Sequence, residues 1–230
     1  MIVDSYRYWC QSQNNYTLLI PNRSIMPSES NLTDEQYKQK MQRRQQVQAE
    51  RIEKSIDKKG LIIVNTGTGK GKTTAALGMV LRSLGHGYRV AIVQFIKGAW
   101  EPAEKAILER FGDQLVFQAM GEGFTWDTQD RDRDIATAER AWELALSYII
   151  DPSYQLVLLD EVNIALKLGY LSPEVVIAGL AQKPELSHVI LTGRGAPQGL
   201  IDIADLVTEM TMIKHPFREQ GVKAQPGIEF

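Results

Sequence analysis

The chain has 230 residues, of which 43% are hydrophobic and 23% charged, and its formal net charge at pH 7 is −2. These values are ordinary for a soluble globular protein and allow one good core, or one core with a tail. The near-neutral charge argues against a general nucleic-acid binder, which is usually basic. The single cysteine, Cys10, excludes an intrachain disulfide and fits a reducing cytoplasm, where we expect the protein to act.

The N-terminal residues show no targeting or membrane signal. Residues 1–20 mix polar side chains such as Asp4 and Arg7 among their apolar ones, and so lack the continuous apolar stretch of a signal peptide. No segment approaches the apolar length of a membrane span, and we expect no membrane association. Residues 1–30 form an irregular extension, because Pro21 and Pro27 break any periodic pattern.

Residues 31–59 are predicted to form a strongly polar helix. Asn31 or Thr33 is expected to cap it, and Asp34 and Glu35 lie in its first turn, where the helix dipole favours acids. The helix is expected to continue to about Lys54, with few apolar positions to anchor it. A helix that is polar nearly all round leaves two interpretations open, a solvated arm or a lid over a site.

From Gly60 onward, short apolar runs alternate with helical patterns. The predicted strands are residues 61–65, 90–94, 115–120, 156–160, 188–192 and 206–212. The predicted helices between them are residues 72–84, 102–111, 132–150, 173–180 and 197–204. This alternation predicts an α/β domain over residues 60–230, with a mostly parallel six-stranded sheet covered by helices on both faces. Ligands of such a sheet bind outside the carboxyl ends of its strands.

The strongest motif follows the first predicted strand. This phosphate loop reads Gly67-Thr68-Gly69-Lys70-Gly71-Lys72-Thr73-Thr74. In a strand–loop–helix of this kind, backbone N–H groups and the helix N-terminus converge on phosphates, and a lysine adds positive charge. The motif therefore predicts binding of a nucleotide triphosphate with Mg²⁺. The alternative, a plain glycine-rich turn, is disfavoured by the strand and helix that flank the loop.

The phosphate loop departs from the general pattern G-x-x-x-x-G-K-[ST]. Thr66 occupies the position of the first glycine, and Gly67 comes one residue later. We expect this shorter loop to hold the phosphates differently from the loop of an ordinary ATPase.

A second motif is an apolar strand that ends in Asp160 and Glu161. In a chain that also has a phosphate loop, this acidic pair predicts a Mg²⁺ site, because Mg²⁺ takes one or two carboxylates together with waters and phosphate oxygens. Thr73 is expected to supply a hydroxyl oxygen to the same ion. The alternative is that Asp160 caps the following helix.

Other candidate residues lie near the same edge of the predicted sheet. Arg194 stands between two glycines after the fifth strand, and its planar guanidinium suits phosphate. Lys97 follows the second strand and either meets a phosphate or is solvated. Arg82, on the helix after the phosphate loop, faces either the nucleotide or solvent. Phe124 and Trp126, in a glycine-bearing segment after the third strand, either cover something flat and apolar or form a satellite core cluster.

Several motifs in order resemble the corrinoid adenosyltransferases of the CobA/BtuR/CobO type. Besides the phosphate loop, they are Val93-Gln94-Phe95-Ile96-Lys97-Gly98, Gly123-Phe124-Thr125-Trp126, Leu159-Asp160-Glu161, Thr192-Gly193-Arg194-Gly195 and Val222-Lys223-Ala224-Gln225. The resemblance covers roughly residues 60–230, and the shortened phosphate loop fits this family's own pattern. It implies a RecA-like sheet, a homodimer, and an N-terminal helix that closes over the corrinoid.

The resemblance also implies the reaction. The 5′-deoxyadenosyl group of ATP passes to the Co(I) centre of a corrinoid, triphosphate is released, and the product serves adenosylcobalamin synthesis or salvage. Co(I) is itself a strong nucleophile, so the protein has to position C5′ and stabilise the leaving triphosphate. Lys72, and Mg²⁺ held by Thr73 and Glu161, would stabilise the triphosphate. Phe124 and Trp126 would pack on the lower face of the corrin and exclude its axial ligand, so that a flavodoxin-like or flavin donor can reduce the cobalt.

Two other functions remain open from the sequence. An ordinary P-loop ATPase or RecA-like motor would release ADP and phosphate, and a nucleotide-binding regulatory module would bind ATP without turnover. Only adenosyl transfer gives Phe124 and Trp126 a role.

Overall fold

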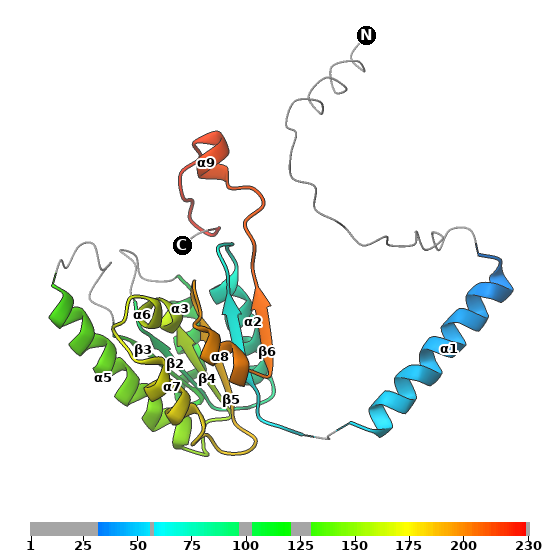
Figure 1. Cartoon of the computed structure of the whole chain (residues 1–230), viewed down its shortest axis with the longest axis horizontal. Coiled ribbons are helices and arrows are strands. Elements are labelled where there is room, and N and C mark those ends of the chain that lie inside the picture. Colours follow the sequence, from blue (N-terminus) through cyan, green and yellow to red (C-terminus); the bar gives the residue numbers. More distant parts are fainter. Residues whose placement is uncertain (1–31, 56–57, 97–102, 121–129, 229–230) are drawn as a thin grey trace, which may run out of the picture. The chain divides into compact units, whose positions relative to one another are not determined.

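The computed structural model describes residues 32–55, 58–96, 103–120 and 130–228. The chain divides into two compact units, Met1–Ile56 and Asp57–Phe230. In the first unit the described element is helix α1 (Asp34–Glu53), labelled in Figure 1. Of the two predicted caps, Thr33 is the N-cap of α1: its hydroxyl accepts a hydrogen bond from Gln36 N–H, and Gln36 Oε1 accepts one from Thr33 N–H. This reciprocal capping box stabilises the start of a helix that has no buried residue of its own.

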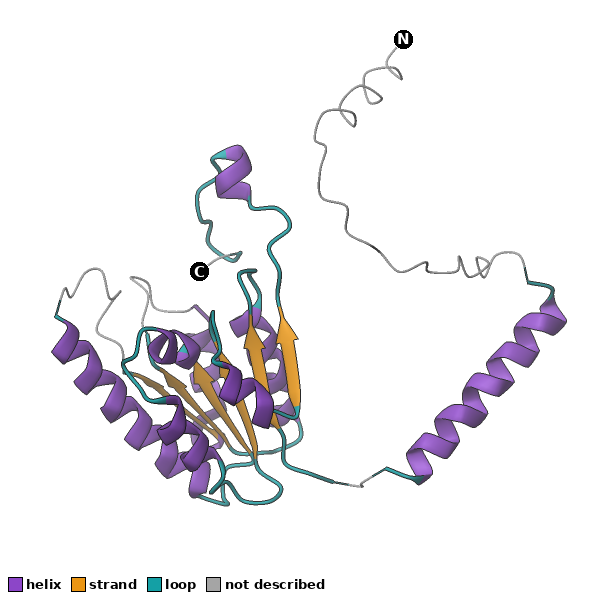
Figure 2. Cartoon of the chain, in the orientation of Figure 1, coloured by secondary structure: helices purple, strands orange, loops and turns teal. Residues whose placement is uncertain are grey.

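Within the described residues, the second unit is built on a six-stranded sheet whose strand pairs are parallel. Its strands are β1 (Ile62–Thr66), β2 (Val90–Gln94), β3 (Leu115–Ala119), β4 (Leu156–Asp160), β5 (His188–Thr192) and β6 (Leu206–Glu209). They lie in the order β3-β2-β4-β5-β1-β6, with the arrows pointing the same way in Figure 2. One strand, β5, separates β1, which leads into the phosphate loop, from β4, which ends in the acidic pair. The predicted α/β fold with a six-stranded parallel sheet is confirmed.

Helices cover both faces of the sheet. They are α2 (Lys72–Gly85), α3 (Ala103–Leu108) with the 3-10 helix η2 (Glu109–Gln114), α5 (Arg131–Ile150), α6 (Val162–Lys167), α7 (Pro173–Leu180) and α8 (Gln198–Ile203). A further helix, α9 (Pro216–Gln220), has no buried residue and belongs to neither apolar cluster. One apolar cluster packs α2 and α3 on the sheet, and a second packs α5, α6, α7 and α8 on the other face. No helix among the described residues is long and apolar enough to cross a membrane.

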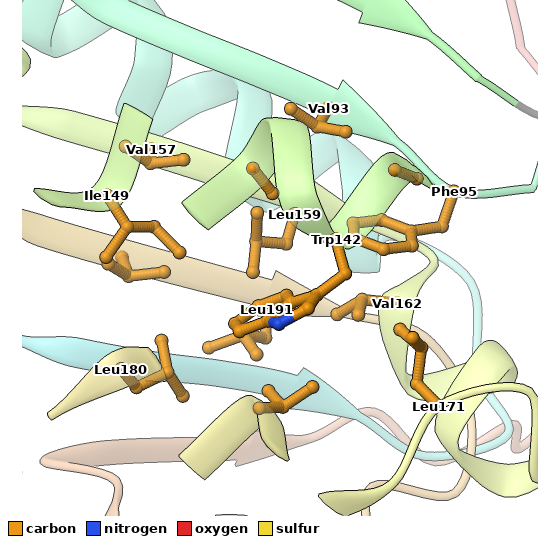
Figure 3. Packing of buried hydrophobic residues seen from close by; sticks show 14 of the residues in the cluster. Val93, Phe95, Trp142, Ile149, Val157, Leu159, Val162, Leu171, Leu180 and Leu191 are labelled. Atoms are coloured by element: carbon orange, nitrogen blue, oxygen red, sulfur yellow. The ribbon is translucent and has the colours of Figure 1, made fainter. Parts of the chain in front are cut away.

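Strand β4 shows why the sequences of the central strands are nearly continuous apolar runs. Its residues Val157 and Leu159 belong to the cluster under α5, whereas Leu156 and Leu158 belong to the cluster under α2. Because successive side chains of a strand point to opposite faces, a sheet covered on both sides needs apolar residues at every position. Figure 3 shows part of the cluster under α5, with Trp142 of α5 among side chains of the central strands.

Several predicted elements differ from the structure. The predicted strand 206–212 is too long: β6 ends at Glu209, and the Met210 backbone then hydrogen-bonds Thr66 O (2.9 Å) and Gly69 N–H (2.6 Å). The predicted helix 102–111 is divided into α3 and η2, and η2 contains a non-helical residue, Gly112. Helices α6 and α9 were not predicted, since each has six residues or fewer and shows too little periodicity.

The contact between α7 and α5 can be tested at Gly179. A Cβ at this position would lie 2.4 Å from Cζ2 of the buried Trp142. Gly179→Ala is therefore expected to lower the free energy of unfolding by about 1–3 kcal/mol, as overpacked cores do. Gly78→Ala in α2 is the matched control, because Gly78 is exposed with nothing within 4 Å of its Cβ position, and it should raise stability by about 0.5–1 kcal/mol. Urea unfolding measures both; a stabilised Gly179→Ala would contradict this packing.

Candidate active site

The phosphate loop, the acidic pair and Arg194 all follow parallel strands, so they emerge at one edge of the sheet. Arg82 does not lie there. It is exposed in the last turn of α2, nine residues beyond Thr73, which is roughly 14 Å along the helix axis. Lys97, Phe124 and Trp126 lie outside the described residues. The structure thus brings together the residues of β1, α2, β4 and β5 and leaves Arg82 apart.

The phosphate loop is shaped by glycines that no other residue could replace without strain. Gly67 and Gly71 have φ of 95° and 99°, in the left-handed region. A Cβ on Gly67 or Gly69 would lie 2.4 or 2.8 Å from Met210 O. The segment after β6 therefore packs against the backbone of the loop. Gly71 is the N-cap of α2 and provides no side-chain cap, which leaves the N-terminal N–H groups suited to an anion.

Lys72 is held inside the phosphate loop. Its side chain is 6% exposed, and Nζ donates to Gly69 O at 2.6 Å. Burial lowers the pKa of Lys72; Glu161 opposes this, while Arg194 and Lys70 lower the pKa further. Phosphate oxygens bound in the loop would therefore stabilise the charged form of the Lys72 side chain. Thr68, Lys70 and Thr74 are exposed.

Asp160 is fixed by donors from three elements. Its Oδ1 accepts hydrogen bonds from Thr73 Oγ1 of α2 (2.8 Å) and Thr192 Oγ1 of β5 (2.7 Å), and its Oδ2 accepts one from Gln94 Nε2 of β2 (3.1 Å). The residue at the N-cap of α6 is Glu161, not Asp160, so the alternative that Asp160 caps this helix is wrong. Asp160 instead orients Thr73, the hydroxyl predicted to bind the metal.

Glu161 differs from Asp160, because its carboxylate is not fully hydrogen-bonded within the described residues. It is the one non-glycine residue with positive φ (59°) in the described part of the chain, and its N–H donates to Thr192 Oγ1 at 2.9 Å. Within that part, its buried Oε2 has no hydrogen-bond partner. Burial raises the pKa of Glu161 to about 7, and Asp160 adds to the rise, whereas Lys72 and Arg194 oppose it. A buried carboxylate oxygen of this kind fits a cation.

These oxygens fit the donor set of Mg²⁺. Glu161 offers a carboxylate oxygen and Thr73 a hydroxyl, beside a loop built for phosphates. The described residues contain no group of three or more His, Cys, Asp and Glu side chains that could hold a metal by themselves. A Mg²⁺ ion that arrives with nucleotide phosphates needs only one or two carboxylates. The residues present are therefore compatible with the predicted metal.

Four residues that shape the site were given no role from the sequence, although Gln94 and Thr192 lie within the motifs that carry the resemblance. Gln94 and Thr192 hold Asp160, Asn163 Nδ2 donates to Gly193 O (3.2 Å), and Met210 packs on the phosphate loop. The sequence signal that could have indicated a role for Gln94 and Thr192 is their position at the ends of strands. Gln94 and Thr192 are the last residues of otherwise apolar strands, as Asp160 is.

A family model described as "ATP:corrinoid adenosyltransferase BtuR/CobO/CobP" matches residues 58–230. The chain belongs to this family. The resemblance found in the sequence is therefore confirmed. A second model, described as "Cob(I)alamin adenosyltransferase N terminal", matches residues 26–52, which include most of α1.

Curated relatives in the corrinoid adenosyltransferase family span nearly the whole chain. The corrinoid adenosyltransferase of Pseudomonas aeruginosa is 49% identical over 203 residues, covering 88% of this chain and 100% of the relative. That of a Sinorhizobium species is 51% identical, covering 86% and 92%. That of Escherichia coli K12 is 44% identical, covering 86% and 100%.

Solved structures of more distant proteins are also similar. The flagellar accessory protein FlaH from Methanocaldococcus jannaschii has a TM-score of 0.42 at 13% identity, over 65% of this chain and 70% of FlaH. The KaiC-like protein PH0186 from Pyrococcus horikoshii OT3 has a TM-score of 0.38 at 17% identity, over 68% and 75%. Neither bears on what this chain binds.

The raised pKa of Glu161 gives a pH-dependent prediction for the protein without metal or nucleotide. A carboxyl whose pKa is raised from 4.5 to about 7 stabilises the fold fully below about pH 4.5, and this contribution is lost as the pH rises through about 7. Between pH 4.5 and pH 8 the wild type should therefore lose up to about 3 kcal/mol of stability relative to Glu161→Gln. Urea unfolding in chelator measures this difference. The exposed Glu139→Gln in α5 is the control, and parallel pH curves for wild type and Glu161→Gln would contradict the assignment.

Proposed function

We propose that this protein transfers the 5′-deoxyadenosyl group of ATP to the Co(I) centre of a corrinoid and releases triphosphate. The observation that carries the proposal is the family match over residues 58–230. The site supports it, because a phosphate loop and a carboxylate suited to Mg²⁺ lie at one edge of the sheet. The nucleophile belongs to the corrinoid, so no side chain has to form a covalent intermediate.

The main task of these residues is to hold ATP by its phosphates and to stabilise triphosphate as it leaves. Lys72 and the N-terminus of α2 supply positive charge, and Arg194 adds a guanidinium whose charge acts on both Lys72 and Glu161. Thr73 and Glu161 hold Mg²⁺, with Asp160 fixing Thr73 through its hydrogen bond. Bound Mg²⁺ supplies further neutralisation of the triphosphate charge. Fixed charges of this kind usually lower the barrier to such a reaction more than any other effect does.

The remaining assignments rest on the family. Phe124 and Trp126 pack against the lower face of the corrin and keep the axial ligand away, and Lys97 contacts the phosphates. The polar helix α1 serves as the lid over the corrinoid. The protein works as a homodimer in the cytoplasm and receives its electron from a flavodoxin-like or flavin donor.

The product of ATP use separates adenosyl transfer from ATP hydrolysis. With reduced cobalamin, Mg²⁺ and ATP, we expect adenosylcobalamin and triphosphate to form in equal amounts. The spectral change on formation of the Co–C bond measures the first product, and analysis of the spent nucleotide measures the second. ADP and phosphate without alkylated corrinoid would contradict the proposal.

Lys72→Ala should lower kcat/KM for ATP about 100-fold or more, because the phosphates lose the buried positive charge of the lysine. Arg82→Ala is the matched control and should leave the kinetics unchanged.

The aromatic pair outside the described residues can be tested separately. Phe124→Ala or Trp126→Ala should impair turnover from a Co(II) substrate much more than turnover from chemically reduced Co(I), because the pair is needed to remove the axial ligand before reduction. Equal losses in both assays would contradict this role.

A further inference from the structure

Thr66 is the residue that breaks the general phosphate-loop pattern, and the structure gives it a contact that glycine cannot make. It is the last residue of β1 and is buried, at 8% exposed. Its Oγ1 accepts a hydrogen bond from Ala196 N–H at 3.2 Å. Ala196 belongs to the Arg194 turn, residues 193–196, which follows β5. The hydroxyl therefore joins this turn to the strand that leads into the phosphate loop.

The other end of the Arg194 turn is also fixed on β1. Gly193 N–H donates to the backbone oxygen of Asn65 at 3.2 Å. The side chain of Asn65 in turn donates to Lys72 O at 3.2 Å. Two adjacent residues, Asn65 and Thr66, thus connect the turn that carries Arg194 to the start of α2, which carries Lys72.

Arg194 lies between these two fixed points. Its side chain is exposed, and the residue before it, Gly193, lies against the acidic pair, since a Cβ on Gly193 would be 3.1 Å from Glu161 Oε2. A fixed backbone lowers the cost of binding, because less of the turn then has to be immobilised when the side chain meets a ligand. The tie at Thr66 limits how far the end of the turn can move.

We propose that Thr66 is a positioning residue that ties the Arg194 turn to the phosphate loop, so that Arg194 and Lys72 meet the phosphates of ATP as one rigid unit. The proposal rests on the proposed function only in taking ATP as the ligand. Without the hydroxyl, Ala196 N–H loses its acceptor and the turn is held on β1 by Gly193 alone.

The test is equilibrium binding of ATP with Mg²⁺ in the absence of corrinoid, measured by calorimetry. Thr66→Val keeps the shape of the side chain and removes the hydroxyl, and should weaken ATP binding about fivefold, the value of one hydrogen bond of ~1 kcal/mol. Thr66→Ser keeps the hydroxyl and should bind as the wild type does. Inorganic triphosphate should show the same loss with Thr66→Val, whereas adenosine should not.

A double-mutant cycle separates positioning from a general loss of structure. In the Arg194→Ala background, Thr66→Val should cause no further loss of ATP binding, because the hydroxyl acts through Arg194. Thr137→Val is the matched control: Thr137 of α5 is also buried and accepts one hydrogen bond, from Arg140 Nη2 at 3.0 Å. The Thr137→Val variant should leave ATP binding unchanged.

If Thr66→Val does not fold, Thr66→Gly removes the same hydroxyl without adding bulk, and the same results are expected from it.

Several results would overturn the inference. They are full additivity of Thr66→Val and Arg194→Ala, failure of Thr66→Ser to restore binding, a loss confined to adenosine, or no ATP binding by the wild type. Binding of ATP without formation of adenosylcobalamin would instead refute the proposed function and leave the role of Thr66 intact. The two proposals can therefore fail separately.

Discussion

The buried carboxylate of Asp160 is the interaction on which the site depends. A charge that is 4% exposed is costly unless it is hydrogen-bonded, and Asp160 meets this requirement with donors from Gln94, Thr73 and Thr192. These donors come from β2, α2 and β5, so a single side chain fixes the carboxyl ends of neighbouring strands and the first turn of the helix after the phosphate loop. Removing it would leave three donors near or inside the core without their acceptor.

The two adjacent acids have different roles because their environments differ. Asp160 ends a strand and is saturated with hydrogen bonds, whereas Glu161 adopts a left-handed conformation and keeps one buried oxygen without a partner among the described residues. A left-handed backbone costs a non-glycine residue about 1–2 kcal/mol. Thr192 stabilises this arrangement from both sides, since its hydroxyl donates to Asp160 and accepts from the N–H of Glu161. Backbone strain that is held in place by neighbours is typical of functional positions.

Most of the sheet, and the residues within the local motifs, could be predicted from the sequence. Strands 90–94, 156–160 and 188–192 were predicted with their observed bounds, because each is a continuous apolar run that ends in a polar residue. The strand beginning at Leu206 was overextended, since the tertiary contact of Met210 with the phosphate loop leaves no trace in periodicity. Gln94, Thr192 and Thr66 acquire their roles only from the strand order, which no local pattern encodes.

That strand order also explains how one strand serves both halves of the site. Neighbouring strands lie about 4.8 Å apart, so the insertion of β5 separates the ends of β1 and β4 by roughly 10 Å. This separation leaves space at the edge of the sheet between the phosphate loop and the acidic pair. The last residue of β5, Thr192, contacts the acidic pair, and the turn that follows carries Arg194, which we propose to bind the phosphates. Burial disfavours the charged forms of both Lys72 and Glu161. Bound phosphates would favour the ammonium and a bound cation the carboxylate, so the two ligands are expected to bind more tightly together than either binds alone.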